Sequence, residues 1–448
     1  MKKLLSMLLA AMLLLAACGS SPIDENQPPA VTPAVDDSVP DDAGSDPQVQ
    51  PLSAMQELVA DESKVTDVKV PFMLEGNEDF SPLGKLSFDL YGQTEGAKNL
   101  KNNVFSPISA AIALGMLLEG TNGETAAELE TMIGWNKNDA LDLFGSLMRE
   151  YAEVNEQTNT TLNLANAAFF SPSLKNASDS TLMNLRDFYR AQAFRGELFT
   201  DSAREFINGW VSEKTDGEIP SVFEKNLDKN VVLVLINTIL LDAKWAYPFE
   251  NFGYEPKMQF TCANGETSEL PCLSDTRYMK YIDTDELIGT IMDYSDSRLK
   301  FMAVKPKNGD ISKLMESFDY AKFVSTVEAA QEGECDFRMP KFSIESEIDL
   351  KDCVKQLGAE LIFDSGRADL SGFGQTEDGN VYVSKIFQKA KIDVDEEGTR
   401  AAAATMAVAV AESAEIVDKE IILDSSFFWC VYDGETDVPL FMGTMCGD

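Results

Sequence analysis

The stretch Glu396-Glu397-Gly398-Thr399-Arg400-Ala401-Ala402-Ala403-Ala404-Thr405-Met406-Ala407-Val408-Ala409-Val410-Ala411 joins two acids and a glycine to a long run of small residues. If the run forms a strand, one of its faces carries only small, uncharged side chains, from Thr399 to Ala411. Such a face can enter a crowded protein interior without steric clash or a buried charge. Gly398 tolerates almost any backbone angle, so it would let the segment swing.

A second interpretation of this stretch is an exposed, alanine-rich helix. Alanine, methionine and glutamate are good helix formers, and the four consecutive alanines fit that structure as well as they fit a strand. The remainder of the chain decides between the two.

The composition excludes several classes of function. The chain has 448 residues, with 37 Lys and Arg against 75 Asp and Glu, for a formal net charge of −38. We therefore expect no nucleic-acid partner and no activation by heparin-like polyanions. Histidine is absent, which removes the usual Ser/His/Asp and Cys/His hydrolases and every histidine-ligated metal site. We expect no metal and no cofactor.

The N-terminus has the features of an export signal. Lys2 and Lys3 precede an apolar run from Leu4 to Leu15, which is short for a membrane-spanning helix. Small residues then lead to Cys18, which resembles a bacterial lipoprotein signal, and this resemblance predicts lipidation of Cys18. The alternative is a plain signal peptide cleaved near Ala17. We expect residues 1–18 to be this signal and the mature protein to be lipid-anchored at the bacterial cell surface.

The next segment, 19–67, is acidic and proline-rich, which is typical of an extended tether. No comparable linker follows, so residues 68–448 are predicted to form one domain. Six further cysteines lie in this part of the chain, and export permits disulfides. Cys262 and Cys272 flank an Asn-Gly turn signal, so they could face each other across two strands.

Periodicity predicts a mixture of helices and strands. The pair Ser106-Pro107 marks a helix start, and the apolar segment 110–119 indicates a buried helix. Segment 231–241 is continuously apolar, as expected of a strand covered on both faces. Further helices are expected at 126–133, 139–154 and 202–214, and further strands at 162–170, 381–394, 420–423, 427–432 and 439–445.

Several motifs, in the same order, resemble the serpin family of protease inhibitors over about residues 80–446. They are Val104-Phe105-Ser106-Pro107-Ile108-Ser109, Asn208-Gly209-Trp210-Val211 with Thr215-Asp216-Gly217-Glu218-Ile219, Leu235-Ile236-Asn237 with Lys244-Trp245, Met339-Pro340-Lys341-Phe342, Ala368-Asp369-Leu370-Ser371-Gly372, and Pro439-Leu440-Phe441-Met442-Gly443. The resemblance implies an α+β fold with three β-sheets, about eight to nine helices and an exposed reactive-centre loop.

The resemblance also gives a role to the segment from Glu396 to Ala411. The segment from Glu396 to Thr405 is similar to the hinge of inhibitory serpins, and this includes Glu397, Arg400 and the alanines from Ala401 to Ala404. In that family, a protease cleaves the loop and becomes acylated, and the freed hinge then inserts as a new strand of the central sheet. Sixteen inserted residues would supply on the order of 10–20 kcal/mol at one net hydrogen bond each. Ordinary folding stability is about 5–15 kcal/mol, so the active form is expected to be metastable.

Further site residues follow from the resemblance alone. Lys341 is expected to pair with Glu396, and Trp245 to pack below the point of entry. Ser109, Asn237 and Gln388 are expected at the centre of the sheet, where the family commonly has a histidine at the position of Gln388. The alternative for these supporting residues is that they only maintain the fold.

The family's spacing places the reactive bond at Glu412-Ser413. The rival primary residues are Val410, Ala411 and Ala414, because the loop after Glu412 is about three residues longer than usual. The resemblance therefore implies a monomeric suicide-substrate inhibitor of a serine endopeptidase, or of a cysteine endopeptidase, rather than an enzyme. Two alternatives are a non-inhibitory serpin-fold binding or structural protein at the cell surface and an enzyme with an unusual base. No Ser-x-x-Lys motif at a helix start supports an enzyme of this kind.

Overall fold

The computed structural model describes residues 55–65, 79–157, 160–249, 254–295, 298–376, 380–399 and 418–447. Cys18, the predicted signal and Arg400 to Val417 of the predicted loop lie outside these ranges, as do the reactive-bond candidates. No helix of the described residues is long and apolar enough to cross a membrane.

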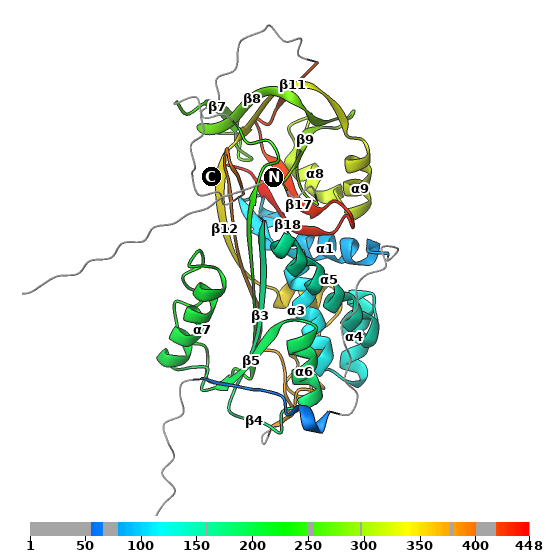
Figure 1. Ribbon diagram of the computed structural model, residues 1–448, viewed down its shortest axis with the longest axis vertical. Coiled ribbons are helices and arrows are strands. Elements are labelled where there is room, and N and C mark those ends of the chain that lie inside the picture. Colours follow the sequence, from blue (N-terminus) through cyan, green and yellow to red (C-terminus); the bar gives the residue numbers. More distant parts are fainter. Residues whose placement is uncertain are drawn as a thin grey trace, which may run out of the picture. The chain divides into compact units, whose positions relative to one another are not determined.

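The predicted α+β class with three sheets is confirmed (Figure 1). The α-helices of the described residues are α1 (Ser81–Gln93), α2 (Glu95–Asn99), α3 (Pro107–Gly120), α4 (Gly123–Ile133), α5 (Lys137–Gln157), α6 (Asp179–Asp187), α7 (Asp201–Lys214), α8 (Ile311–Ser317), α9 (Tyr320–Glu328) and α10 (Lys351–Gln356). The predicted start of α3 is visible in its cap, because the Ser106 side chain accepts a hydrogen bond from the N–H of Ser109 at 3.4 Å.

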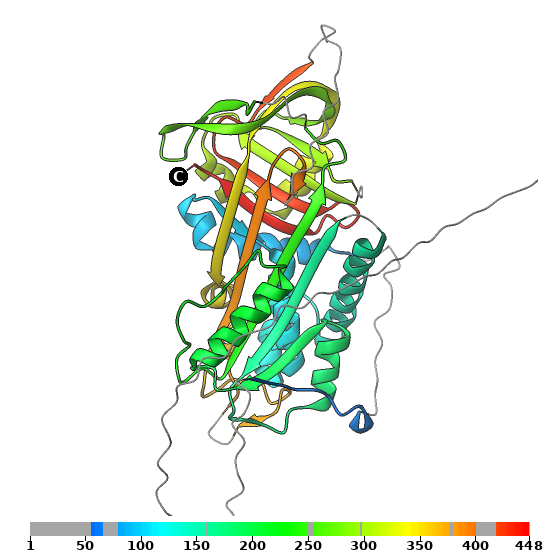
Figure 2. The same ribbon diagram turned by 60° about the vertical axis from the view of Figure 1, so that its left-hand side comes forward.

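A central seven-stranded sheet runs along the molecule (Figure 2). Its strands, in spatial order, are β1 (Met55–Glu57), β5 (Ala191–Gly196), β3 (Thr161–Phe170), β6 (Leu233–Lys244), β15 (Gly398–Thr399), β14 (Lys385–Val394) and β12 (Phe342–Asp349). The apolar run predicted as a covered strand forms most of β6. Helix α7 covers one face of the sheet, and α3 and α6 lie on the other (Figure 1).

The two faces of the sheet belong to different apolar clusters. Trp210 and Ile207 of α7 pack with Ile236 and Phe387 on the outer face. Helix α3 is buried along its whole length against the inner face and joins the main core. A central strand of this sheet therefore needs side chains that can be buried on both sides.

Among the described residues, the second sheet has nine strands and the third has two. The second contains β16 (Lys419–Ile422), β11 (Gln331–Pro340), β8 (Thr267–Asp283), β9 (Leu287–Asp293), β10 (Leu299–Pro306), β17 (Phe427–Asp433), β18 (Pro439–Met445) and β2 (Asn103–Phe105) in spatial order, with β7 (Lys257–Thr261) pairing with β8. The third contains β13 (Gln375–Thr376) and β4 (Leu174–Lys175).

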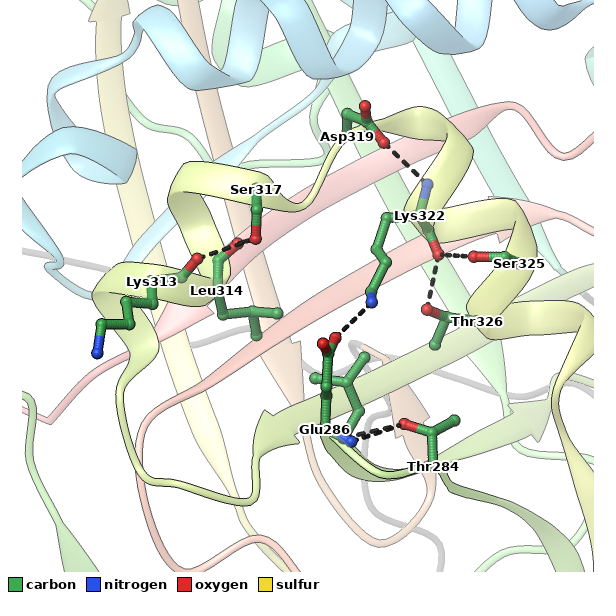
Figure 3. Close-up of polar contacts among 10 residues, drawn as sticks. Thr284, Glu286, Lys313, Leu314, Ser317, Asp319, Lys322, Ser325 and Thr326 are labelled. Carbon is green, nitrogen blue, oxygen red and sulfur yellow. Dashed lines mark hydrogen bonds and ion pairs between the residues drawn. The ribbon is translucent and has the colours of Figure 1, made fainter.

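Helix α9 is tied to the second sheet by an ion pair (Figure 3). Lys322 of α9 forms an ion pair with Glu286 at 2.5 Å, next to the start of β9. The Asp319 side chain caps α9 by accepting from the N–H of Lys322 at 2.9 Å, and Thr326 donates to the Lys322 carbonyl at 2.6 Å. The ion pair holds α9 beside β9, and the other two hydrogen bonds stabilise α9 itself.

Two sequence-based expectations differ from the structure. Met55–Glu57 lies within the predicted tether, yet it forms β1 and pairs antiparallel with β5 at the sheet edge. The proposed facing of Cys262 and Cys272 is wrong, because Thr261 pairs with Thr267 while Lys257 pairs with Pro271. Cys262 is thus at the turn of this hairpin and Cys272 at its far end. Both cysteines are buried and unpaired.

Candidate functional site: the head of the central sheet

The predicted hinge begins as a strand that enters the central sheet. Gly398 pairs with Lys244 of β6, and Thr399 pairs with both Ala243 of β6 and Val394 of β14. Further down, β6 and β14 pair directly with each other in parallel, over Val234–Ile239 and Lys385–Ala390. The sheet is therefore open at its head, where it holds the first hinge residues, and closed below.

A tight turn sends the chain back into the sheet after β14. The Asp395 carboxylate accepts hydrogen bonds from the N–H groups of Glu397 at 2.8 Å and Gly398 at 3.2 Å, while the Asp395 N–H donates to the Gly398 carbonyl at 3.0 Å. Aspartate commonly stabilises turns in this way. A Cβ atom on Gly398 would lie 2.1 Å from the Ala243 carbonyl oxygen, so only glycine fits this position.

Lys341 connects this turn to a neighbouring segment. Its ammonium lies 3.1 Å from Glu396 and 2.7 Å from Glu255, and only 19% of the Lys341 side chain is exposed. Burial lowers the pKa of Lys341, but the hydrogen bonds to Glu255 and Glu396 outweigh it and the net shift is upward. The structure thus brings together Lys341 and Glu396, the pair expected from the sequence, and adds Glu255 as a second acid.

Trp245 lies directly against the hinge. Its backbone N–H donates to the Glu397 carbonyl and its indole N–H to the Asp395 carbonyl, both at 2.9 Å. The indole stacks on Tyr294 with ring centroids 4.7 Å apart. The Tyr294 hydroxyl in turn lies 2.5 Å from the hydroxyl of Thr399, whose side chain is buried. Trp245 and Tyr294 therefore form the surface on which the first inserted residue rests.

A buried cluster of neutral polar groups lies lower in the sheet. The Gln388 amide donates to the Ser109 hydroxyl at 3.2 Å and to the Ser106 carbonyl at 2.7 Å, and its oxygen accepts from the Ser106 N–H at 2.9 Å. Asn237 is in register with Gln388 and donates to the Asn166 side chain. Among the described residues, the Asn237 side-chain oxygen has no hydrogen-bond partner although it is buried, a costly state for a polar atom.

These features agree with comparisons to known proteins. The family model described as "Serpin (serine protease inhibitor)" matches residues 82–447, which is most of the chain. The chain belongs to the serpin family. Serpins are protease inhibitors and not enzymes, and the fold with its three sheets is that of the family.

Individual serpins are similar over nearly their whole length. The leukocyte elastase inhibitor of Xenopus laevis is 28% identical over 369 residues, which cover 80% of this chain and 96% of that protein. The native crystal structure of the thermophilic serpin tengpin superposes with a TM-score of 0.78 at 26% identity and covers 88% of this chain and all of tengpin. Human thyroxine-binding globulin complexed with thyroxine gives 0.72 at 26% identity, covering 82% of this chain and 97% of that one.

The sequence did not indicate three residues that shape this part of the serpin. Tyr294 contacts Thr399 of the hinge, and Glu255 contacts Lys341, which pairs with Glu396. No periodicity or motif marks Tyr294 or Glu255. Asp395 is different, because an aspartate shortly before a glycine is a common sequence signal of a turn. Its side chain can accept hydrogen bonds from the N–H groups two and three residues later, as it does here with Glu397 and Gly398. The hinge residues Arg400 to Thr405 lie outside the described residues.

The Asp395 turn gives a testable pH dependence. Burial raises the pKa of Asp395; the hydrogen bonds from the N–H groups of Glu397 and Gly398 oppose this shift, and the charges of Glu396 and Glu397 add to it. The native state therefore holds its proton more tightly than the unfolded state. This group's contribution to stability is full below the ordinary pKa of 3.8 and is lost as pH rises from there through the raised pKa of the native state.

We expect Asp395→Asn, which keeps the accepting oxygen, to melt at a higher temperature than the wild type at pH 7 but at the same temperature near pH 3. Thermal unfolding followed by circular dichroism across this range measures the difference. A lower melting temperature for the variant at pH 7 would contradict the assigned charge penalty.

Proposed function

We propose that this serpin is a suicide-substrate inhibitor of a serine endopeptidase, which it traps as an acyl-enzyme when the cleaved loop inserts into the central sheet. The observation that carries this proposal is the sheet opening itself. Gly398 and Thr399 already occupy the position of a new strand between β6 and β14. The residues that follow them in sequence are small or uncharged at every inward position.

The existing registers predict where each hinge residue would go. If the strand continued from Thr399 in the registers with β6 and β14, Thr405 would lie between Asn237 and Gln388, which are already in register with each other. Both partners lie on the inner face, so Thr405 would present its hydroxyl there. It would lie beside the Asn237 oxygen that has no partner among the described residues. This placement supports insertion of the segment as a central strand.

The same registers give the outward-facing residues suitable neighbours. Arg400 would lie between Asp242 of β6 and Asp393 of β14 on the outer face. Met406 would lie between Ile236 and Phe387, which belong to the apolar cluster beneath α7. Charge thus meets opposite charge, and the large apolar residue meets apolar residues.

Insertion would release a large free energy. In the continued register the segment gains ten residue pairs with β6 and nine with β14, and it replaces the six pairs that now join those strands directly. At about 0.5–1.5 kcal/mol per net hydrogen bond, the gain is on the order of 10 kcal/mol. This is comparable with the whole stability of a typical domain, so the native form is metastable in the proposal.

The length of β6, the strand along which the loop would pair, favours Glu412 as the primary residue. The first residue of β6, Leu233, would pair with Ala409. Glu412 would therefore lie just past the far end of the sheet, at a place where an attached protease has room. The twelve residues of β6 span roughly 40 Å at about 3.3 Å per residue, which is the distance that the acyl-enzyme would be carried.

The proposal is tested with the full mature chain and a panel of glutamate-specific, elastase-like and subtilisin-like serine proteases. We expect a complex that survives boiling in detergent with one of them, together with a released C-terminal peptide that starts at Ser413 by mass spectrometry. A peptide start after Val410, Ala411 or Ala414 would reassign the bond. Rapid cleavage without any stable complex would instead favour a non-inhibitory serpin-fold binding protein.

We also propose that Cys18 is lipidated and anchors the inhibitor at a bacterial cell surface. The support is the apolar run before Cys18 and the acidic, proline-rich segment after it, which would hold the domain away from the membrane. Incorporation of labelled palmitate into the wild type, and its loss in Cys18→Ala, is the expected result. Equal labelling of both proteins would refute the anchor.

A further inference from the structure

A cavity of about 280 Å³ lies where β8 and β9 separate, behind the hinge. The register between these strands ends at Lys280 and Ile291, but β9 continues to Asp293. Trp245 forms an isolated β-bridge with Tyr294 just beyond that point. The next two residues lie between the two strands, because Ala246 donates to the Asp293 carbonyl of β9 and Tyr247 accepts from Arg277 of β8. The cavity therefore arises because a third segment keeps two strands apart.

The floor and rim of the cavity differ in character. The floor is apolar and buried, and includes Trp245, Ile291 and Met292. The rim carries Tyr247 and Tyr278, whose exposed fractions of 78% and 66% are among the largest of the described large hydrophobic residues. Exposed aromatic rings around an apolar hollow are typical of a binding site.

Arg277 holds one side of the rim in place. Its guanidinium donates to the carbonyls of Tyr247 at 2.6 Å and Pro248 at 3.3 Å, and it lies 4.0 Å from the centre of the Phe249 ring. It also forms an ion pair with Asp275 at 2.5 Å. Arg277 uses most of its N–H donors in these contacts, so its role is to hold the side of the cavity in place. A charged ligand would therefore be bound by another residue.

Lys280 is the cation with capacity to bind a ligand. It reaches Asp293 at 3.5 Å, a long ion pair, and Asp293 is already bound by Lys300 at 2.6 Å. Glu332, the other acid of the lining, lies 3.4 Å from the hydroxyl of Tyr278. A carboxylate in the cavity would therefore gain a charge-assisted hydrogen bond from Lys280 without breaking a strong pair.

We propose that this cavity is a binding site for a small aromatic carboxylate, with the ring against Trp245 and Met292 and the carboxylate on Lys280. The volume suits a ligand of one or two rings. The site goes beyond protease inhibition, but Trp245 connects the two, since its indole also donates to the Asp395 carbonyl in the hinge turn. An occupant would hold Trp245 in the position that fixes the hinge.

The test uses isothermal titration calorimetry of the full mature chain with three probes that share the indole ring: indole-3-acetate, indole and tryptamine. We expect saturable binding of indole-3-acetate at one site per chain, at least tenfold tighter than that of the neutral or cationic probe. The melting temperature should rise with indole-3-acetate concentration, and above the dissociation constant it should rise with the logarithm of that concentration. No saturable binding of indole-3-acetate up to about 5 mM, or equal binding of tryptamine, overturns the proposal.

Variants locate the site and need no protease, so this test can fail independently of the inhibitor proposal. Lys280→Gln, at a partly exposed position, should weaken indole-3-acetate binding at least tenfold and remove the preference over indole. Lys229→Gln is the matched control, because Lys229 lies over the ring of Phe199 and away from the lining. Unchanged binding in Lys280→Gln, or an equal loss in both variants, overturns the assignment.

Discussion

Replacing Ala403 by glutamate is expected to convert this serpin from an inhibitor into a substrate. The continued register places Ala403 between Ala390 and Ile239, which are both 1% exposed. A carboxylate there would have to be buried without a partner, at a cost of about 3 kcal/mol or more. If the insertion step bears this cost, insertion slows roughly 100-fold relative to hydrolysis of the acyl-enzyme. The measurement is the fraction of protease found in detergent-stable complex against the fraction released active.

Ala402→Glu is the matched control for this prediction. The same register turns Ala402 to the outer face beside Lys391, which is partly exposed and already pairs with Glu218 and Asp393, so the same charge has a cation nearby. We expect this variant to inhibit nearly as well as the wild type. Equal inhibition by both variants would show that the assigned inward face is wrong. Thr399 is a poorer site for the test, because it is already buried against Tyr294 and its replacement would disturb the starting structure.

The sequence predicted the fold through local patterns that have one structural meaning. Ser106-Pro107 marked the start of α3, and the apolar run before Lys244 marked the covered strand β6. In both cases the physical requirement, a capped helix end or a strand buried on two faces, can be satisfied by few residue types. The small side chains after Gly398 belong to the same class of signal, and their placement stays a prediction.

Contacts between distant segments could not be read in this way. Tyr294 meets Thr399 across 105 residues of sequence, and Glu255 meets Lys341 across 86. A tyrosine in a strand or a glutamate before one is compatible with many environments, so neither carries a signal of its own. The pairing of β1 with β5 was missed for a related reason, because three residues are too few to show a period. The Cys262–Cys272 prediction failed because a turn signal fixes the reversal of the chain and leaves the strand register open.

Cleavage of the loop is expected to raise the melting temperature of the isolated serpin by roughly 10–20 °C. The estimate combines the free energy of insertion, on the order of 10 kcal/mol, with a shift of about 1–2 °C per kcal/mol for a domain of this size. The physical reason is that, in the proposal, the cut frees residues 400–409 to continue the strand that begins with Gly398 and Thr399. Differential scanning calorimetry before and after limited proteolysis, with the cut mapped by mass spectrometry, measures it.

Two controls separate insertion from other effects of a cut. Removing only residues before Met55, which precede β1 in the sequence, should leave the melting temperature nearly unchanged. Ala403→Glu cut at the same bond should gain much less than the wild type, because its freed strand must bury a charge. An unchanged melting temperature in the cut wild type would mean that the loop stays outside the sheet. In that case the opening at Gly398 and Thr399 would be a fixed feature of the fold, and trapping of the acyl-enzyme would lose its source of energy.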